Sequence, residues 1–191
     1  MVNTPAGEWF RAIDSVAIES DISLIHDRVA HEVRGKAPIC LASGSCCKFD
    51  AFDHRLYATG LEAARCIHIC EHEGQGIDLA QLEAARERGN CPWQNGRLCL
   101  ARSGRPVGCR VFYCDPRASD WVPEIAEWAH SEMKSLHERH SIPYMYGEWR
   151  GMLESILKDM PARPSADSQD KPIRNSQSHS LKQLPNSPPS E

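Results

Sequence analysis

The distribution of cysteine along the chain constrains its fold more than any other feature. The chain of 191 residues contains nine cysteines, and seven of them fall into two short clusters. The upstream cluster reads CLASGSCC, and the downstream cluster reads CPWQNGRLCLARSGRPVGCRVFYC. A fold that uses these thiols together must bring two distant segments to one place. The other segments of the chain would then hold these two segments in position.

Clustered thiols of this kind favour a metal site, because thiolate sulfur is a soft ligand for zinc, iron–sulfur clusters and Cu(I). Structural zinc takes four nitrogen or sulfur ligands, and a cubane cluster takes four thiolates. Neither cluster has the repeated C-x2-C spacing of common zinc or iron–sulfur sites. The expected cofactor is therefore zinc, iron or an iron–sulfur cluster. The candidate ligands are Cys40, Cys46, Cys47, Cys91, Cys99, Cys109 and Cys114.

The residues between the cysteines also suit a metal site. Gly96, Gly104 and Gly108 allow tight turns with positive φ, which direct N–H groups towards sulfur. Arginines beside the cysteines would offset thiolate charge and lower the pKa of the thiols. The residues expected to support the ligands or to shape their turns are Arg105, Arg110, Pro92 and Pro106.

The downstream cluster resembles the YkgJ-type cysteine-cluster family, whose members are described as chelating zinc or iron. The family's second motif, approximately CP-(x6–8)-C…RP-x2-CR-x-(F/Y)-x-C, is matched by Cys91-Pro92, Cys99, Arg105-Pro106, Cys109-Arg110 and Cys114. In its first motif, C-x2-C-x2-C-C, Ser43 stands where one cysteine is usual. The resemblance covers roughly residues 38–116. It implies metal binding and leaves any reaction undefined.

Composition indicates a globular protein with reduced thiols. The longest apolar runs fall short of a membrane span, and the first ten residues lack the features of a secretory signal. We therefore expect a cytoplasmic protein without a membrane segment, in which a disulfide framework is disfavoured. The net charge of −4 argues against a basic surface that binds nucleic acid, so no nucleic-acid partner is expected. A protein partner is compatible with the sequence.

Hydrophobic periodicity predicts a mainly α fold with a small, irregular, cysteine-rich metal-binding core. Residues 8–34 read as helix with a break near Ser20, and Thr59 with Glu62 forms a capping box. The segments RLCLA and CRVFYC are candidates for two short strands of one β-hairpin. Further helices are expected over 59–72, 77–88, 120–140 and 147–159.

Several residues outside the two clusters leave alternatives open. Cys66 and Cys70 share one face of the 59–72 helix and are either an additional pair of ligands or buried packing residues; packing is favoured. Phe49 and Phe52 are expected beneath the site, whereas His26, His31, His68 and His72 are expected at the surface. A group that could border a pocket comprises His130, His137, His140, Tyr144 and Tyr146.

The composition changes after residue 160. Residues 161–191 contain seven serines and six prolines but no aromatic residue or cysteine. Such a segment buries too little apolar surface to offset its chain entropy, so a disordered tail is expected. The predicted organisation is a metal-binding domain with flanking helices over 1–160, followed by this tail.

Three functions are compatible with these features. The first is a redox-active metal protein, acting in electron transfer or as part of a protein-modifying enzyme. The second is a structural zinc module that presents a surface to a partner, since four thiolates close a zinc site. The third is a metal chaperone or thiol sensor that uses Cys46 and Cys47 beside Lys48. No common catalytic motif is present, so no catalytic residue is assigned and enzyme activity stays open.

Overall fold

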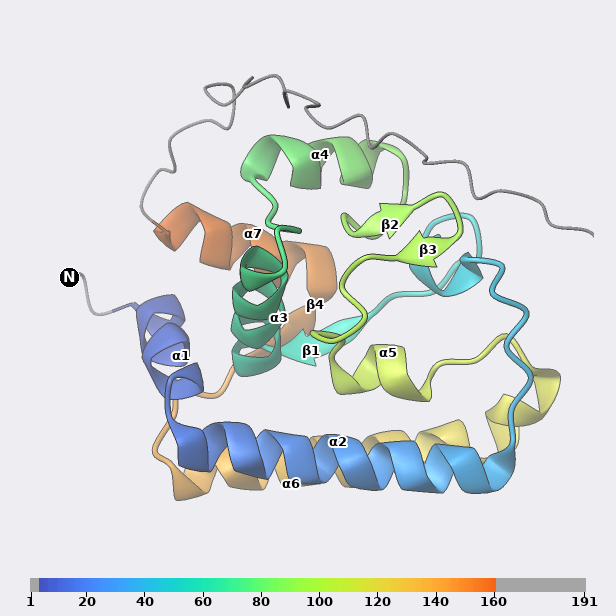
Figure 1. Ribbon diagram of the computed structural model, residues 1–191, viewed down its shortest axis with the longest axis horizontal. Coiled ribbons are helices and arrows are strands. Elements are labelled where there is room, and N and C mark those ends of the chain that lie inside the picture. The colour runs from blue at the N-terminus through green and yellow to red at the C-terminus, as the bar shows by residue number, and fades with distance from the viewer. Residues whose placement is uncertain (1–3, 161–191) are drawn as a thin grey trace, which may run out of the picture. The chain divides into compact units, whose positions relative to one another are not determined.

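Helices dominate residues 4–160, which are the residues that the computed structural model describes (Figure 1). The helices are α1 (Pro5–Ile13), α2 (Val16–Lys36), α3 (Gly60–His72), α4 (Leu79–Glu87), α5 (Val107–Val111), α6 (Val122–Arg139) and α7 (Trp149–Asp159). Two 3-10 turns, η1 (Ser45–Cys47) and η2 (Pro116–Asp120), lie in the connections. The predicted mainly α class is confirmed. The predicted tail lies outside the described residues.

The helices pack in two groups that meet around α5 and the short strands. The long helices α2 and α6 lie side by side, and α5 packs on both of them (Figure 1). Helix α3 contacts α1 and α7, and α4 covers α7. One continuous apolar core runs through both groups. No helix within residues 4–160 combines the length and the apolar character needed to cross a membrane.

Four short strands form two antiparallel pairs. Strand β1 (Tyr57–Thr59) pairs with β4 (Tyr146–Glu148), which joins the entrance of α3 to that of α7. Strands β2 (Gln94–Asn95) and β3 (Leu98–Cys99) form a hairpin inside the downstream cysteine cluster. A strand within RLCLA was therefore predicted correctly, but the predicted hairpin of RLCLA with CRVFYC is wrong.

The segment CRVFYC does not form a strand, because Cys109, Arg110 and Val111 belong to helix α5. The cause is a tertiary contact at the start of this helix. The Val107 N–H donates to the Glu62 carboxylate over 2.8 Å, which satisfies one of the free donors of the first turn. A partner 45 residues away in the sequence thus decides the local structure.

Glu62 also completes the predicted capping box of α3. Its second carboxylate oxygen accepts hydrogen bonds from the Thr59 N–H and the Thr59 hydroxyl, each 2.9 Å long. The Thr59 Oγ1 accepts in turn from the Glu62 N–H. Glu62 is only 4% exposed, so its charge is stabilised by these donors and not by water. The start of α5 is thereby fixed to the start of α3.

Two predictions about the N-terminal helices are wrong. The break falls at Asp14 and Ser15, between α1 and α2, and not near Ser20. His26 is buried, at 5% exposure, whereas His31 is exposed as expected. His26 lies four residues after Ile22 and three before Val29, so it belongs to the buried stripe of α2. Burial, together with the charges of Arg110 and Arg65, lowers the pKa of His26 to about 2.

The contact of α1 with α3 provides a stability test at a glycine. A Cβ atom added to Gly60 would lie 2.2 Å from ring carbons of Trp9, whose indole N–H is held by the Pro143 carbonyl. Gly60→Ala should therefore lower the free energy of unfolding by about 1–3 kcal/mol, the usual cost of overpacking. Urea denaturation followed by circular dichroism measures this change.

Gly35→Ala is the matched control, because an added Cβ at that helical position meets nothing within 4 Å. This change should leave the free energy of unfolding equal or raise it by up to about 1 kcal/mol, since alanine favours the helix. Equal urea midpoints for Gly60→Ala and the unmodified chain would disprove the close packing of α1 on α3.

Candidate metal centre

Two backbone hydrogen bonds join the segments that carry the two cysteine clusters. The Cys91 N–H donates to the Cys47 carbonyl over 2.8 Å, and the Asp50 N–H donates to the Gly89 carbonyl over 3.0 Å. These bonds place the turn η1 directly beside the start of the downstream cluster. The prediction that the chain brings its two clusters together is therefore confirmed at this junction.

A close backbone contact extends the junction towards the hairpin. Gly44 has a positive φ of 76°, and a Cβ atom there would lie 3.0 Å from the Cα of Arg97. The Gly44 carbonyl accepts a hydrogen bond from the Gln94 side-chain amide, 3.2 Å long. The Arg97 guanidinium donates to the Ala42 carbonyl over 3.2 Å. A side chain at position 44 would separate the two segments.

A small cavity of about 30 Å³ lies at this junction. Because one water needs at least about 10–15 Å³, the space suits one or two groups of that size. Arg105 contributes the one cationic side chain among the described residues that line it. The remaining lining is dominated by thiols from η1, α3, the hairpin region and α5, namely Cys46, Cys47, Cys66, Cys91, Cys99 and Cys109.

Cys47 is the centre of the thiol group on one side of the cavity. Its Sγ lies 4.0 Å from that of Cys46, and it also forms hydrogen bonds with Cys91 and Cys99. These bonds with neighbouring thiols raise the pKa of Cys47. Cys47 therefore remains protonated and can donate to its neighbours.

The same contacts stabilise two thiolates. The hydrogen bond with Cys47 lowers the pKa of Cys46 to about 6, and positive charge from Arg105 and Arg102 contributes. The pKa of Cys99 is also lowered to about 6 by its hydrogen bond with Cys47, assisted by a backbone hydrogen bond from Ala101. Because Cys47 has one S–H proton and can donate it to one sulfur at a time, the hydrogen bond stabilises one of these two thiolates at a time.

The thiols on the opposite side have raised pKa values. A hydrogen bond with Cys70, followed by burial, raises the pKa of Cys66. Burial of the sulfur and the proximity of Cys91 and Cys99 raise the pKa of Cys109. Ionising these thiols requires a nearby positive charge, so a cation in the cavity would favour their deprotonation.

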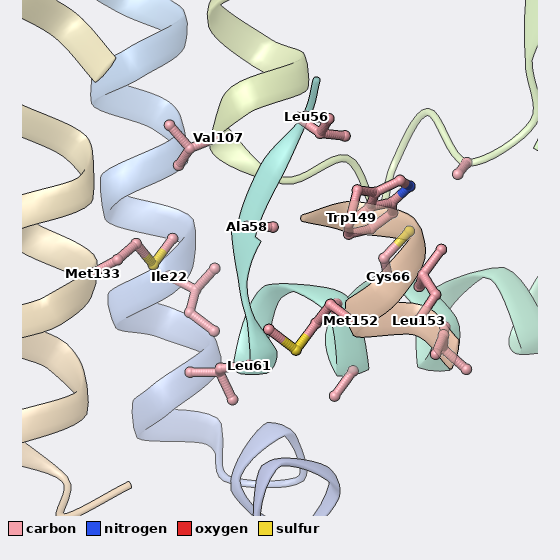
Figure 2. Close-up of a cluster of buried hydrophobic side chains, with 14 of the residues drawn as sticks. Ile22, Leu56, Ala58, Leu61, Cys66, Val107, Met133, Trp149, Met152 and Leu153 are labelled. Atoms are coloured by element: carbon pink, nitrogen blue, oxygen red, sulfur yellow. The ribbon is translucent and has the colours of Figure 1, made fainter. Parts of the chain in front are cut away.

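Trp149 provides an unpaired donor in the wall of the cavity. The residue begins α7, and Figure 2 shows its ring beside the sulfur of Cys66. Its indole Nε1 is buried and has no hydrogen-bond partner among residues 4–160. An indole nitrogen can only donate, and a buried donor without an acceptor costs about 1–3 kcal/mol. A thiolate ligand in the cavity could accept this bond.

The predicted supporting residues have different roles. Arg105 lines the cavity, as does Pro106. Arg110 instead holds the loop that precedes α5, because its guanidinium donates to the carbonyls of Arg105, over 2.8 Å, and Ser103, over 3.0 Å. Arg110 thus acts on the backbone that carries Arg105 and does not line the cavity.

The prediction of positive φ holds for one of the three glycines. Gly96 has a φ of 59° in the hairpin, whereas Gly104 and Gly108 do not have positive φ. Both are nevertheless sites of close packing, since an added Cβ would lie 3.0 Å from the Cα of Cys66 at Gly104 and 2.5 Å from Leu56 at Gly108. The physical requirement there is space and not backbone conformation.

Two predicted ligands lie away from the cavity. Cys40 and Cys114 are exposed and do not line it. Their chain neighbours meet at a separate surface junction, where the Ile39 N–H donates to the Asp115 carboxylate over 3.0 Å. Arg117 binds the same carboxylate and holds the pKa of Asp115 well below its usual range. The structure therefore brings five of the seven predicted ligands to one cavity.

The histidines and phenylalanines are distributed as follows. His130 contacts the Tyr144 hydroxyl, and its ring stacks on that of Tyr146 with the ring centroids 4.2 Å apart. None of the histidines and tyrosines of this group lines the cavity. His137 is buried and donates from Nδ1 to the Pro143 carbonyl over 3.1 Å. Phe49 is buried at the cavity as expected, whereas Phe52 is exposed. The remaining histidine of the group, His140, contacts Asp21.

Within residues 4–160, no three His, Cys, Asp or Glu side chains are arranged around a common point as ligands of one ion. The six sulfurs face one cavity but do not converge. In a tetrahedral zinc site with Zn–S bonds of 2.3 Å, two sulfurs are about 3.8 Å apart. The Cys46 and Cys47 sulfurs, at 4.0 Å, already have nearly this separation. Thiols are suitable donors for a soft ion, and this pair has nearly the spacing of two ligands of one ion.

No family model, curated protein or solved structure matches this chain. The resemblance of the cysteine spacing to the YkgJ-type family therefore stays a prediction. The chemistry of the site must be argued from its own residues.

The lowered pKa of Cys46 predicts unusual alkylation kinetics, because the thiolate is the reactive form. In chain treated with reductant and chelator, the iodoacetamide labelling rate of Cys46 should fall to half its maximum near pH 6. At pH 7 about 90% of such a thiol is ionised, against about 3% of an ordinary one. Mass spectrometry of the labelled peptide over pH 5–9 measures the profile.

A short synthetic peptide that contains Cys46 is the control, since it has the same local sequence without the folded surroundings. Its labelling should follow an ordinary thiol, with half the maximal rate near about pH 8.5. Identical profiles for the folded chain and the peptide would show that Cys47 and the arginines do not stabilise the Cys46 thiolate.

Proposed function

We propose that this chain is a metal-binding protein whose cysteine cavity coordinates zinc or iron. The observation that carries the proposal is that thiols from four separate segments line one cavity. Free cysteine is often buried singly as a packing residue. Six thiols around a cavity of about 30 Å³ form a denser group than single packing cysteines provide.

The proposed ligands are drawn from the thiols that line the cavity, and the two clusters supply five of these thiols. Their chemistry suits a soft or borderline cation, which prefers thiolate over carboxylate. The pKa values of Cys46 and Cys99 are lowered, and a cation would offset the charge of their thiolates and of further thiolates. The set comprises Cys46, Cys47, Cys91, Cys99 and Cys109.

The separation of the Cys46 and Cys47 sulfurs favours a single tetrahedral ion over a cubane cluster. Adjacent ligands of one ion lie about 3.8 Å apart, close to the 4.0 Å between these sulfurs. A bound zinc ion would connect the two segments and contribute its binding free energy to folding. Iron would additionally supply one-electron chemistry. In either case, Arg105 and the Trp149 N–H would stabilise the thiolates from the cavity wall.

A thiol redox protein is the second candidate. It is favoured by Cys46, an exposed thiol with a pKa of about 6 directly beside the protonated Cys47. For either function we infer a reducing compartment such as the cytoplasm, because thiols persist there.

Elemental analysis and absorption spectroscopy of the full chain, purified without oxygen, test the proposal. A colourless protein with stoichiometric zinc would support the structural centre, and iron with visible absorption would support the redox centre. Absence of both metals, together with failure to bind added Zn²⁺ or Fe²⁺, would overturn metal binding. It would leave the thiol redox candidate.

Substitution of the central thiol should weaken the site. Cys47→Ser removes the sulfur that contacts three other thiols, so we expect the bound zinc or iron per chain to fall by more than half. Cys114→Ser is the control, because Cys114 is exposed and away from the cavity. Its metal content should equal that of the unmodified chain. Equal loss in both variants, or full loading of Cys47→Ser, would contradict the proposed ligand set.

A further inference from the structure

Helix α3 carries two cysteines with similar burial but different surroundings. Cys66 and Cys70 are one helical turn apart, and both are 0% exposed. Cys66 lines the cavity, whereas Cys70 lies behind it and does not. Figure 2 shows the Cys66 sulfur directed towards Trp149, another residue of the cavity wall. Burial alone therefore does not account for the position of Cys66.

The approach of the downstream cluster to α3 positions the Cys66 sulfur. A Cβ atom on Gly104 would lie 3.0 Å from the Cα of Cys66 and 3.3 Å from its Sγ. The absence of a side chain at position 104 thus lets the loop before α5 pass directly over Cys66. Glu62, one turn earlier on α3, holds the start of α5 through the Val107 N–H. Both contacts fix Cys66 relative to Cys109.

Ser43 leaves the upstream cluster one sulfur short of the related motif. Its hydroxyl contacts the Ser45 hydroxyl at 2.8 Å and accepts from the Ser45 N–H. Ser43 therefore stabilises the loop before η1 and does not line the cavity. Within residues 4–160, the one thiol that lines the cavity from outside the two clusters is Cys66.

We infer that Cys66 is a ligand of the metal centre and supplies a thiolate from α3. The inference rests on the proposed metal-binding function. It adds a ligand carried on the interior of a rigid helix to ligands carried on loops, turns and the short helix α5.

Cobalt titration of matched variants tests this inference. Co²⁺ serves as the spectroscopic ion, because each thiolate bound to it contributes sulfur-to-metal charge-transfer absorption. In Cys66→Ser we expect at least tenfold weaker Co²⁺ binding and roughly a quarter less charge-transfer intensity, as for loss of one of four ligands. Cys70→Ser, with the same burial on the same helix, should retain the affinity and the spectrum of the unmodified chain.

A measurement on the unmodified chain covers the case in which Cys66→Ser does not fold. Scalar coupling between bound ¹¹³Cd and cysteine β protons identifies ligands directly by NMR. A correlation to the Cys66 β protons, without one to those of Cys70, is expected. Cadmium correlations to cluster cysteines but not to Cys66 would overturn the inference and leave the proposed function standing. Failure of the unmodified chain to bind Co²⁺ or Cd²⁺ would instead overturn both.

Discussion

The structure of the cysteine cavity depends on the backbone pairing of residues 47–50 with residues 89–91. These segments are separated by α3 and α4, and closing a loop of this length costs about 3 kcal/mol in chain entropy. Gly89, with a φ of 70°, turns the chain after α4 so that its carbonyl reaches the Asp50 N–H. The packing of α4 on α7 therefore determines where the downstream cluster begins.

A second constraint acts from the opposite side of the cavity. The carboxylate of Glu62 is buried and fully occupied by donors from Thr59 and Val107. It connects the starts of α3 and α5, the helices that carry Cys66 and Cys109. Removal of the carboxylate would leave two buried backbone N–H groups without an acceptor, each of which costs about 1–3 kcal/mol. The position of two sulfurs thus depends on a residue that is not itself part of the cavity.

Local patterns in the sequence predicted most of the helical fold. The capping box of Thr59 and Glu62 and the helix expected over 120–140 depend on neighbours within one or two turns, and both predictions are confirmed. CRVFYC was misassigned as a strand because its helix is stabilised by Glu62, far away in sequence. His26 was expected at the surface but is buried, because it lies between Ile22 and Val29 in the apolar stripe of α2.

The candidate site was also predictable only in part, because some of its contacts join residues far apart in the sequence. Clustering identified five thiols that line the cavity, but exposure of Cys40 and Cys114 depends on the junction of Ile39 with Asp115. Periodicity placed Cys66 and Cys70 on one buried face and could not distinguish which of them meets a cavity. The approach of Gly104 makes that distinction, and a local sequence window does not contain it.

The division of the sulfurs between loops and helices has a consequence for local stability. Most of the cavity thiols lie on connecting segments with few regular hydrogen bonds, whereas α2 packs on α6 and α3 on α7 over long apolar faces. Segments of the first kind open at lower free energy than packed helices do. The wall formed by α3 and α7 can therefore persist while the loops around it open. Backbone amide hydrogen exchange would then be fastest in the loops that carry most of the cavity thiols.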